Sequence, residues 1–196
     1  SVFDMLKIGV GPSSSHTLGP WRAAERWLRE VQDTHELSTI ERVKVNLFGS
    51  LSLTGKGHAT DVAIALGLMG EDPVTTDCDD IADKIATLKQ TNRIHLGQRH
   101  YISFHYDEDI IFNRQFLPYH ANGMRFEALL TNSSKISETF YSIGGGFVVK
   151  EEREYAEENK TLFSTFPHPV KTGKELLDHC ACQQKSISEI VWENEL

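Results

Sequence analysis

The sequence has no excess of positive charge and no long apolar run. It contains 20 Lys and Arg against 28 Asp and Glu, for a formal net charge of -8, and no stretch gathers basic residues into a patch. Proteins that bind DNA or RNA neutralise phosphates with such patches, so nucleic acid is not an expected partner. The longest apolar run, residues 62–69, is less than half of the roughly 20 residues that a membrane-spanning helix needs. We therefore expect no membrane segment.

Cysteine is also scarce. Cys78, Cys180 and Cys182 are odd in number, and only one residue separates the last two. This usage favours reduced thiols and a cytoplasmic location over a disulfide scaffold. The chain has neither a paired CxxC nor an HExxH motif, and three histidines spaced five apart (His95, His100 and His105) favour an ordinary structural or surface role. We expect no metal ligand in this chain.

The composition is that of an ordinary globular protein. The chain has 196 residues, of which 39% are hydrophobic and 24% charged, and it shows no internal repeat. The periodicity of apolar residues predicts helices at 18–31, 61–69, 77–90, 174–184 and 187–196, and strands at 42–48, 100–106, 125–130, 135–141 and 147–149. Polar Gly-rich loops are expected at 9–19 and 49–60, and a solvated connection at 151–160. Without regular βαβ alternation, this order predicts an α+β (mixed α/β) fold in a single domain, residues 1–196, which we expect to be a fragment of a longer protein.

Three familiar glycine motifs are excluded. In the segment from Gly49 to Gly57, five residues separate the first two glycines, and Gly57 follows Lys56 where a phosphate-binding loop needs Ser or Thr. Gly9 and Gly11 lack the third glycine of a dinucleotide-binding fingerprint, and no G-x-S-x-G elbow is present. These absences leave three other segments that core packing does not explain.

The first segment, residues 11–20 (GPSSSHTLGP), places hydroxyl groups and His16 directly before a predicted helix. Free backbone N–H groups at a helix start attract anions, and the hydroxyls of Ser13, Ser14, Ser15 and Thr17 add further donors. A substrate carboxylate would suit this place. A well-capped helix N-terminus explains the same residues equally well, so the sequence leaves both interpretations open.

The second segment, residues 49–61 (GSLSLTGKGHATD), presents His58 at a predicted loop tip, with Thr60 or Asp61 placed to cap the next helix. Glycines let a backbone approach a ligand closely, and imidazole titrates near neutrality, so His58 is a candidate proton acceptor. A flexible hairpin tip with an exposed histidine is the alternative.

The third segment, residues 117–124 (LPYHANGM), places His120 in a turn formed by Asn122 and Gly123. Taken alone, a turn with an incidental histidine is the simpler interpretation. Three loops that each combine a histidine with hydroxyl or amide neighbours nevertheless indicate a functional site together.

These segments, with the opening SVFD and residues 141–147 (YSIGGGF), strongly resemble the N-terminal (β) domain of the bacterial iron–sulfur L-serine dehydratases. They occur in the order and approximate spacing of that family, and the resemblance covers essentially the whole chain. It implies deamination of L-serine to pyruvate and ammonia with a [4Fe–4S] cluster, and a homodimer at full length. It also implies a mixed sheet with packed helices, similar to the allosteric substrate-binding domain of phosphoglycerate dehydrogenases.

The resemblance also implies where the cofactor is held. A [4Fe–4S] cluster usually takes three or four thiolates, and the three cysteines here lie in no cluster motif. In the family the ligands belong to a C-terminal (α) domain, which this chain lacks. The implied partners are therefore L-serine and the protein's own C-terminal domain.

By the same resemblance, His58 is expected to be the general base, with Thr60 supporting its orientation and contributing to the substrate site. His16 and the loop from Ser13 to Thr17 would bind substrate or transfer protons, and His120 and Asn122 would complete the site or gate it. A non-catalytic module that binds small anions is the alternative function, and a scaffold protein is the third. Turnover that survives the loss of His58 would favour the binding module.

Overall fold

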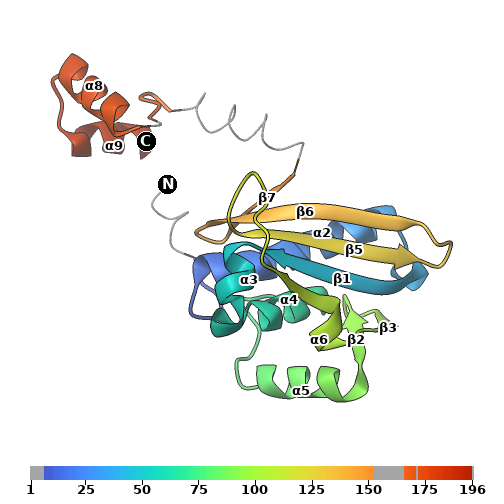
Figure 1. The fold of residues 1–196 in the computed structure, drawn as a ribbon. Helices are drawn as coiled ribbons and strands as arrows, with labels where there is room; N and C mark the ends of the chain where they lie inside the picture. The colour runs from blue at the N-terminus through green and yellow to red at the C-terminus, as the bar shows by residue number, and fades with distance from the viewer. Residues whose placement is uncertain (1–6, 152–165, 171, 196) are drawn as a thin grey trace. The chain divides into compact units, whose positions relative to one another are not determined.

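A computed structural model of the chain describes residues 7–151, 166–170 and 172–195. Its internal contacts divide the chain into two compact units, one spanning residues 2–151 and the other containing residues 152–196. The larger unit holds the sheet, the helices packed on it and all three histidine segments (Figure 1). The expectation of a single domain over residues 1–196 stays a prediction, and each unit is described by itself.

The larger unit is built on one mixed, seven-stranded sheet. Six strands follow the order β2-β3-β1-β5-β6-β7, and the seventh, β4, pairs with β1 outside this order. The long central strand β1 pairs with β5 in antiparallel orientation on one side and with β3 and β4, both parallel, on the other. The strands are β1 (Ile40–Phe48), β2 (Arg93–Leu96), β3 (His100–Ser103), β4 (Ile110–Asn113), β5 (Gly123–Leu130), β6 (Lys135–Gly144) and β7 (Phe147–Lys150).

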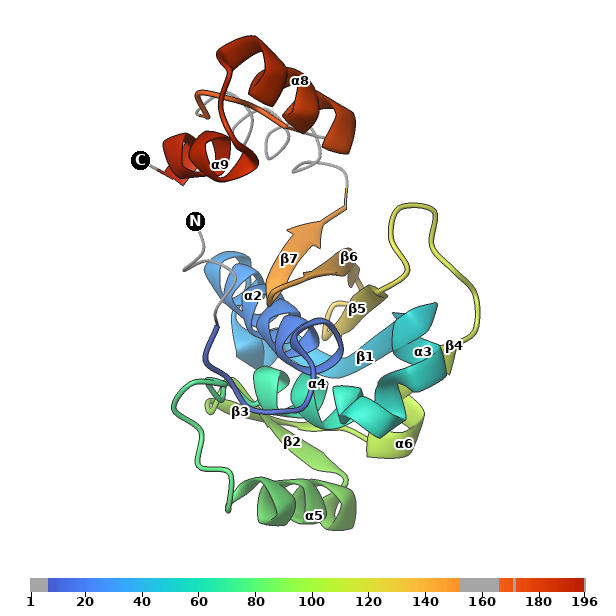
Figure 2. The same ribbon diagram turned by 90° about the vertical axis from the view of Figure 1, so that its left-hand side faces the viewer.

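Two helices cover one face of this sheet, α2 (Gly19–Thr34) and α4 (Thr60–Leu68) (Figures 1 and 2). They pack so closely that a Cβ added at Gly67 would lie 2.6 Å from the Ala24 Cβ. Trp21 and Trp27 of α2 are buried in the core between helices and sheet, and the indole N–H of Trp21 donates to the Glu71 carbonyl at 2.7 Å. This layer fixes the N-terminus of α2 beside that of α4.

The alternation of buried and half-buried side chains along the strands shows which face of the sheet the helices cover. In β1 the side chains of Val43, Val45 and Leu47 are buried, whereas Lys44 and Asn46 between them are half-buried. An antiparallel or mixed sheet that packs one face on helices and leaves the other partly solvated produces this period of two. The same alternation runs through β5, so the two strands present one continuous apolar face to the helices.

The predicted mixed α/β fold is confirmed, and most predicted elements are present with shifted ends. The helix expected at 77–90 is α5 (Ile81–Thr91), and the strand expected at 100–106 ends at Ser103 because α6 (Tyr106–Asp109) follows. The short strands β2 and β4 were not predicted. The polar loop expected at 49–60 is wrong: this segment is helical, with α3 (Ser50–Thr54) and the 3-10 helix η3 (Gly55–His58).

The smaller unit contains α8 (Gly173–Gln183) and α9 (Ile187–Glu195). A capping box begins α8, because the Thr172 hydroxyl accepts from the Glu175 N–H while the Glu175 carboxylate accepts from the Thr172 N–H. Both helices were predicted. The connection expected at 151–160 lies, apart from its first residue, outside the described residues. No helix in the described ranges is long and apolar enough to cross a membrane.

Candidate functional site

His16 lies in a tight turn at the N-terminus of α2. The π-helical turn η1 (Ser14–Leu18) runs directly into α2, and its N-cap residue Ser13 accepts the His16 N–H on its hydroxyl at 3.1 Å. Serine hydroxyls also contact both imidazole nitrogens, because Ser15 Oγ lies 2.9 Å from Nδ1 and Ser50 Oγ lies 2.9 Å from Nε2. The ring of this half-buried histidine is therefore held from two sides.

His58 lies at the end of η3, where the chain turns into α4. Its Nδ1 is 3.0 Å from the Thr54 carbonyl oxygen, four residues earlier. A carbonyl only accepts, so Nδ1 carries the proton of the neutral ring and the lone pair is left on Nε2. Among the described residues Nε2 has no hydrogen-bond partner, so no protein donor in this part of the chain occupies its lone pair. The expected loop tip is thus replaced by a helical turn that sets the tautomer of His58.

Two threonine hydroxyls join the two histidine segments reciprocally. Thr17 Oγ1 donates to the His58 carbonyl at 2.8 Å, and Thr60 Oγ1 donates to the His16 carbonyl at 2.5 Å. Both threonines are buried, with 3% and 0% of their surface exposed. The crossed bonds hold the two imidazole rings 5.0 Å apart between centroids at an interplanar angle of 41°.

Thr60 and Asp61 do not cap α4 as expected. Ala59 occupies the N-cap position with a positive φ of 53°, and no side chain caps the helix there. The Thr60 hydroxyl is used by the His16 carbonyl instead, and the Asp61 carboxylate accepts from the adjacent Val62 N–H at 3.1 Å. The Thr60 hydroxyl, which was expected to cap α4, therefore makes a tertiary hydrogen bond to the His16 segment instead.

The environment of His16 disfavours its charged form. Partial burial lowers the pKa of His16, the neighbouring His58 lowers it further by charge repulsion, and a hydrogen bond with the Ser50 backbone raises it. His16 is accordingly neutral at neutral pH. A neutral imidazole hydrogen-bonded at both nitrogens is suited to orienting groups around it.

The third segment is attached to the same place through the backbone. The Ser50 N–H donates to the Ala121 carbonyl at 2.8 Å, and the Asn122 N–H donates to His120 Nδ1 at 3.1 Å. The buried Asn122 amide donates to the Ser142 carbonyl at 3.1 Å, which fastens the turn to β6. Since Nδ1 of His120 accepts, the proton of its neutral ring lies on Nε2, the opposite tautomer to that of His58.

The structure thus brings the three sequence segments to adjacent places, and it adds one residue that the sequence analysis did not select. Ser50 contacts His16 through its side chain and Ala121 through its backbone. No sequence signal identifies it, because its imidazole partner is 34 residues away. Substrate binding by Ser13, Ser14, Ser15, Thr17, Thr60 and Asn122, and catalysis by His16, His58 and His120, stay predictions.

The cysteines do not form a cofactor site in the described part of the chain. Cys78 is exposed in the larger unit, and the other two cysteines lie on α8 of the smaller one. The described residues contain no group of three or more His, Cys, Asp or Glu side chains that could hold a metal ion. These residues therefore do not fit an iron–sulfur cluster.

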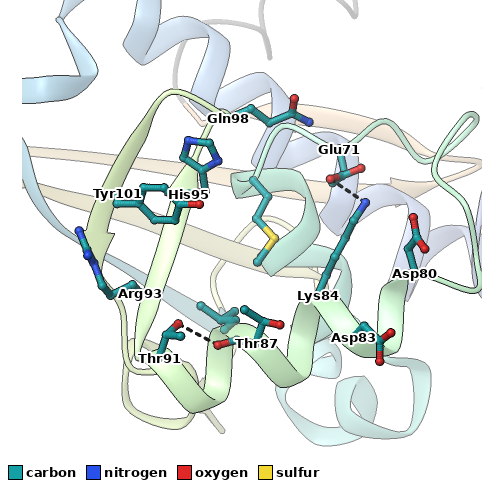
Figure 3. Close-up of a pocket in the computed structure, with 12 residues that line it drawn as sticks. Glu71, Asp80, Asp83, Lys84, Thr87, Thr91, Arg93, His95, Gln98 and Tyr101 are labelled. Carbon is teal, nitrogen blue, oxygen red and sulfur yellow. Dashed lines mark hydrogen bonds and ion pairs between the residues drawn. The ribbon is translucent and has the colours of Figure 1, made fainter.

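A cavity of about 530 Å³ lies elsewhere in the larger unit, between α5 and the hairpin of β2 and β3 (Figure 3). At one end Glu71 and Lys84 form an ion pair at 2.8 Å, and at the other His95 stacks on Tyr101 with 4.1 Å between ring centroids. Met69 also lines the cavity. No residue of the three histidine segments lines this cavity.

Comparison with known proteins places these observations in a family context. A family model described as serine dehydratase beta chain matches residues 1–153. The L-serine dehydratase of Streptomyces coelicolor is 43% identical over 197 aligned positions, which cover 100% of this chain and 43% of that protein. L-serine dehydratase 1 of Escherichia coli is 42% identical and the L-serine dehydratase of Haemophilus influenzae 40% identical, with the same coverage. The chain spans less than half the length of these curated relatives.

Proposed function

The chain belongs to the serine dehydratase beta chain family, and we propose on that basis that it is the N-terminal β domain of an L-serine dehydratase. In this role it supplies substrate-binding and proton-transfer residues for the conversion of L-serine to pyruvate and ammonia. Relatives that carry this name match it over its full length. The whole protein would be a cytoplasmic homodimer that contains a further C-terminal domain.

The observation that carries the proposal is the pair of fixed imidazoles. The His58 ring is held as the Nδ1–H tautomer by the Thr54 carbonyl, so its Nε2 lone pair is available to a substrate. The His16 ring lies 5.0 Å away and is hydrogen-bonded at both nitrogens. The His58 ring can thus accept a proton, as general base catalysis requires, while the His16 ring, occupied at both nitrogens, holds the adjoining segments in place.

The reaction removes one proton from Cα of serine and the hydroxyl from Cβ. His58 Nε2 would accept the Cα proton, and the electron pair of that bond would form the Cα–Cβ double bond as hydroxide leaves. The leaving hydroxide takes up the proton that His58 accepted and departs as water, which returns His58 to its neutral form. The aminoacrylate tautomerises to the imine, and water hydrolyses the imine to pyruvate and ammonia. The loop from Ser13 to Thr17 would bind the substrate carboxylate, while His120 and Asn122 would close the site.

We propose that the iron–sulfur cluster is bound outside this chain. Cys78 and the two cysteines of α8 belong to different units of the protein, and the described residues provide no ligand cluster. The residues of this chain would bind and orient L-serine toward a cofactor that the C-terminal domain holds.

The test compares this chain with the same chain extended through its native downstream reading frame. Both are reconstituted anaerobically with iron and sulfide, and pyruvate release from L-serine is measured. We expect turnover only in the extended protein. Extended protein that holds its cluster but releases no pyruvate would contradict the dehydratase assignment.

His58→Ala in the extended protein tests the assigned base. Loss of a general base lowers kcat by about 10²- to 10⁴-fold. His100→Ala is the matched control, since His100 lies on β3 away from the three segments. Turnover that survives His58→Ala nearly intact would favour the alternative function of a binding module.

A further inference from the structure

Ser50 occupies a junction between the three histidine segments. It is the first residue of α3, and its hydroxyl oxygen lies 2.9 Å from Nε2 of His16. Its backbone N–H donates to the Ala121 carbonyl at 2.8 Å. One residue of the second segment therefore contacts the imidazole of the first and the backbone of the third.

The preceding glycine explains why Ser50 reaches this position. Gly49 has φ 55° and ψ -124°, a conformation that side-chain-bearing residues rarely adopt, and it redirects the chain from the end of β1 into α3. Its N–H donates to the Gln115 carbonyl at 2.8 Å, and an added Cβ would lie only 2.4 Å from the Ala121 oxygen. The third segment thus passes directly beside Ser50 because position 49 has no side chain.

We infer that Ser50 is a positioning residue, which holds the His16 ring through Nε2 and couples it to the turn that carries His120 and Asn122. The inference deepens the proposed function and rests on it for its catalytic consequence. Ser50 acts through His16 and need not contact the substrate itself.

The two hydroxyl contacts of His16 differ in what they can fix. Ser15 is the adjacent residue and moves with the same turn, so its bond to Nδ1 fixes the ring only relative to η1. Ser50 belongs to the segment that carries His58, so its bond fixes the ring relative to the second imidazole. Without the Ser50 hydroxyl, Ser15 is the one side chain among the described residues that still hydrogen-bonds a nitrogen of the ring.

The same bond separates the roles of the two histidines. Ser50 occupies Nε2 of His16, whereas Nε2 of His58 has no partner among the described residues. A proton from the substrate therefore has an unoccupied acceptor on His58 and an occupied one on His16. By occupying Nε2 of His16, Ser50 gives that ring an orienting role, and His58 remains the proton acceptor.

Three variants test the inference: Ser50→Ala removes the hydroxyl, Ser50→Thr retains it, and Ser52→Ala is the control on the same helix. The first measurement is ¹H–¹⁵N NMR of the imidazole groups in this 196-residue chain. In Ser50→Ala we expect a shifted His16 Nε2 resonance, because the hydroxyl 2.9 Å from that nitrogen is lost, whereas the backbone hydrogen bond of Ser50 that raises the His16 pKa is retained. The titratable group that acts on His16 is His58, whose own resonances report whether the neighbouring ring has moved.

The second measurement is serine turnover by the extended protein. We expect Ser50→Ala to lower kcat by about 10- to 100-fold, the loss typical of a misoriented site, with a much smaller change in KM. Ser50→Thr should restore most of the activity and Ser52→Ala should retain it. An equal loss in Ser52→Ala, or no recovery in Ser50→Thr, would overturn the positioning role.

The two measurements also separate this inference from the proposed function. If the wild-type extended protein turns over no serine, the dehydratase proposal fails, while the NMR comparison still decides whether Ser50 holds His16. His16 resonances that are identical in wild type and Ser50→Ala would overturn the inference even in an active enzyme.

Discussion

At the scale of single residues, the candidate site is held by side chains that donate to backbone carbonyls. Thr17 donates to His58 and Thr60 donates to His16, so each histidine segment is fixed by a hydroxyl from the other. Both threonines are buried, and a buried polar group that loses its hydrogen bond lowers the stability of the fold. The distance between the imidazoles therefore depends on residues that do not themselves bear an acid or a base.

Thr60→Val should reveal this dependence. Valine keeps the β-branched shape but leaves the His16 carbonyl without its donor, so we expect the free energy of unfolding to fall by about 1–3 kcal/mol. Urea denaturation of the 196-residue chain measures it. Thr60→Ser retains the hydroxyl and should lose less, and a Thr60→Val chain as stable as wild type would contradict the account of crossed bonds.

At the scale of elements, the contact between α2 and α4 determines where the histidine turns meet. Each helix begins at one of the segments, because η1 leads into α2 and η3 leads into α4. Gly67 lets the two helices approach, since an added Cβ would lie 2.6 Å from Ala24 Cβ and 2.7 Å from the Trp21 carbonyl oxygen. Packed backbone and core side chains leave little room to relax.

Gly67→Ala should therefore destabilise the protein even though alanine favours helix by about 1 kcal/mol over glycine. Overpacking costs about 1–3 kcal/mol, and we expect a net loss of unfolding free energy together with lower activity of the extended protein. Gly57→Ala is the control for stability, because a Cβ at that position meets nothing within 4 Å. Equal urea midpoints for the two variants would contradict the close-approach argument.

At the scale of the whole molecule, the core belongs almost entirely to the larger unit. Among the described residues, Ile190 is the one buried hydrophobic side chain of the smaller unit, and the rest lie between Leu18 and Val149. The family match likewise ends at residue 153, close to the boundary between the units. A hydrophobic core of this kind is what allows a domain to fold independently.

We accordingly expect residues 1–151 to fold without the remainder of the chain. Calorimetry should show one cooperative transition with a melting temperature close to that of the corresponding transition in the 196-residue chain. The ring resonances of His16 and His58 should also be unchanged, because their described contacts lie within this part. A truncated protein without a cooperative transition would contradict the division into units.

Local patterns in the sequence determined the main secondary-structure elements and indicated where the candidate site lies. The alternation of Val43, Val45 and Leu47 predicted β1, and the helical spacing from Leu18 to Val31 predicted α2, because side-chain period reports directly which face is buried. The three histidine segments were found from their composition, and the order of the segments indicated the family to which the chain belongs.

Tertiary structure decided the rest. The four-residue strands β2 and β4 were not predicted, and residues 50–58 are helical although the glycines of this segment suggest a loop. The tautomer of His58 follows from a carbonyl that only the helical turn places in reach. Ser50 acquires its role from a partner 34 residues distant, and contacts of that separation are set by packing of the helices and sheet.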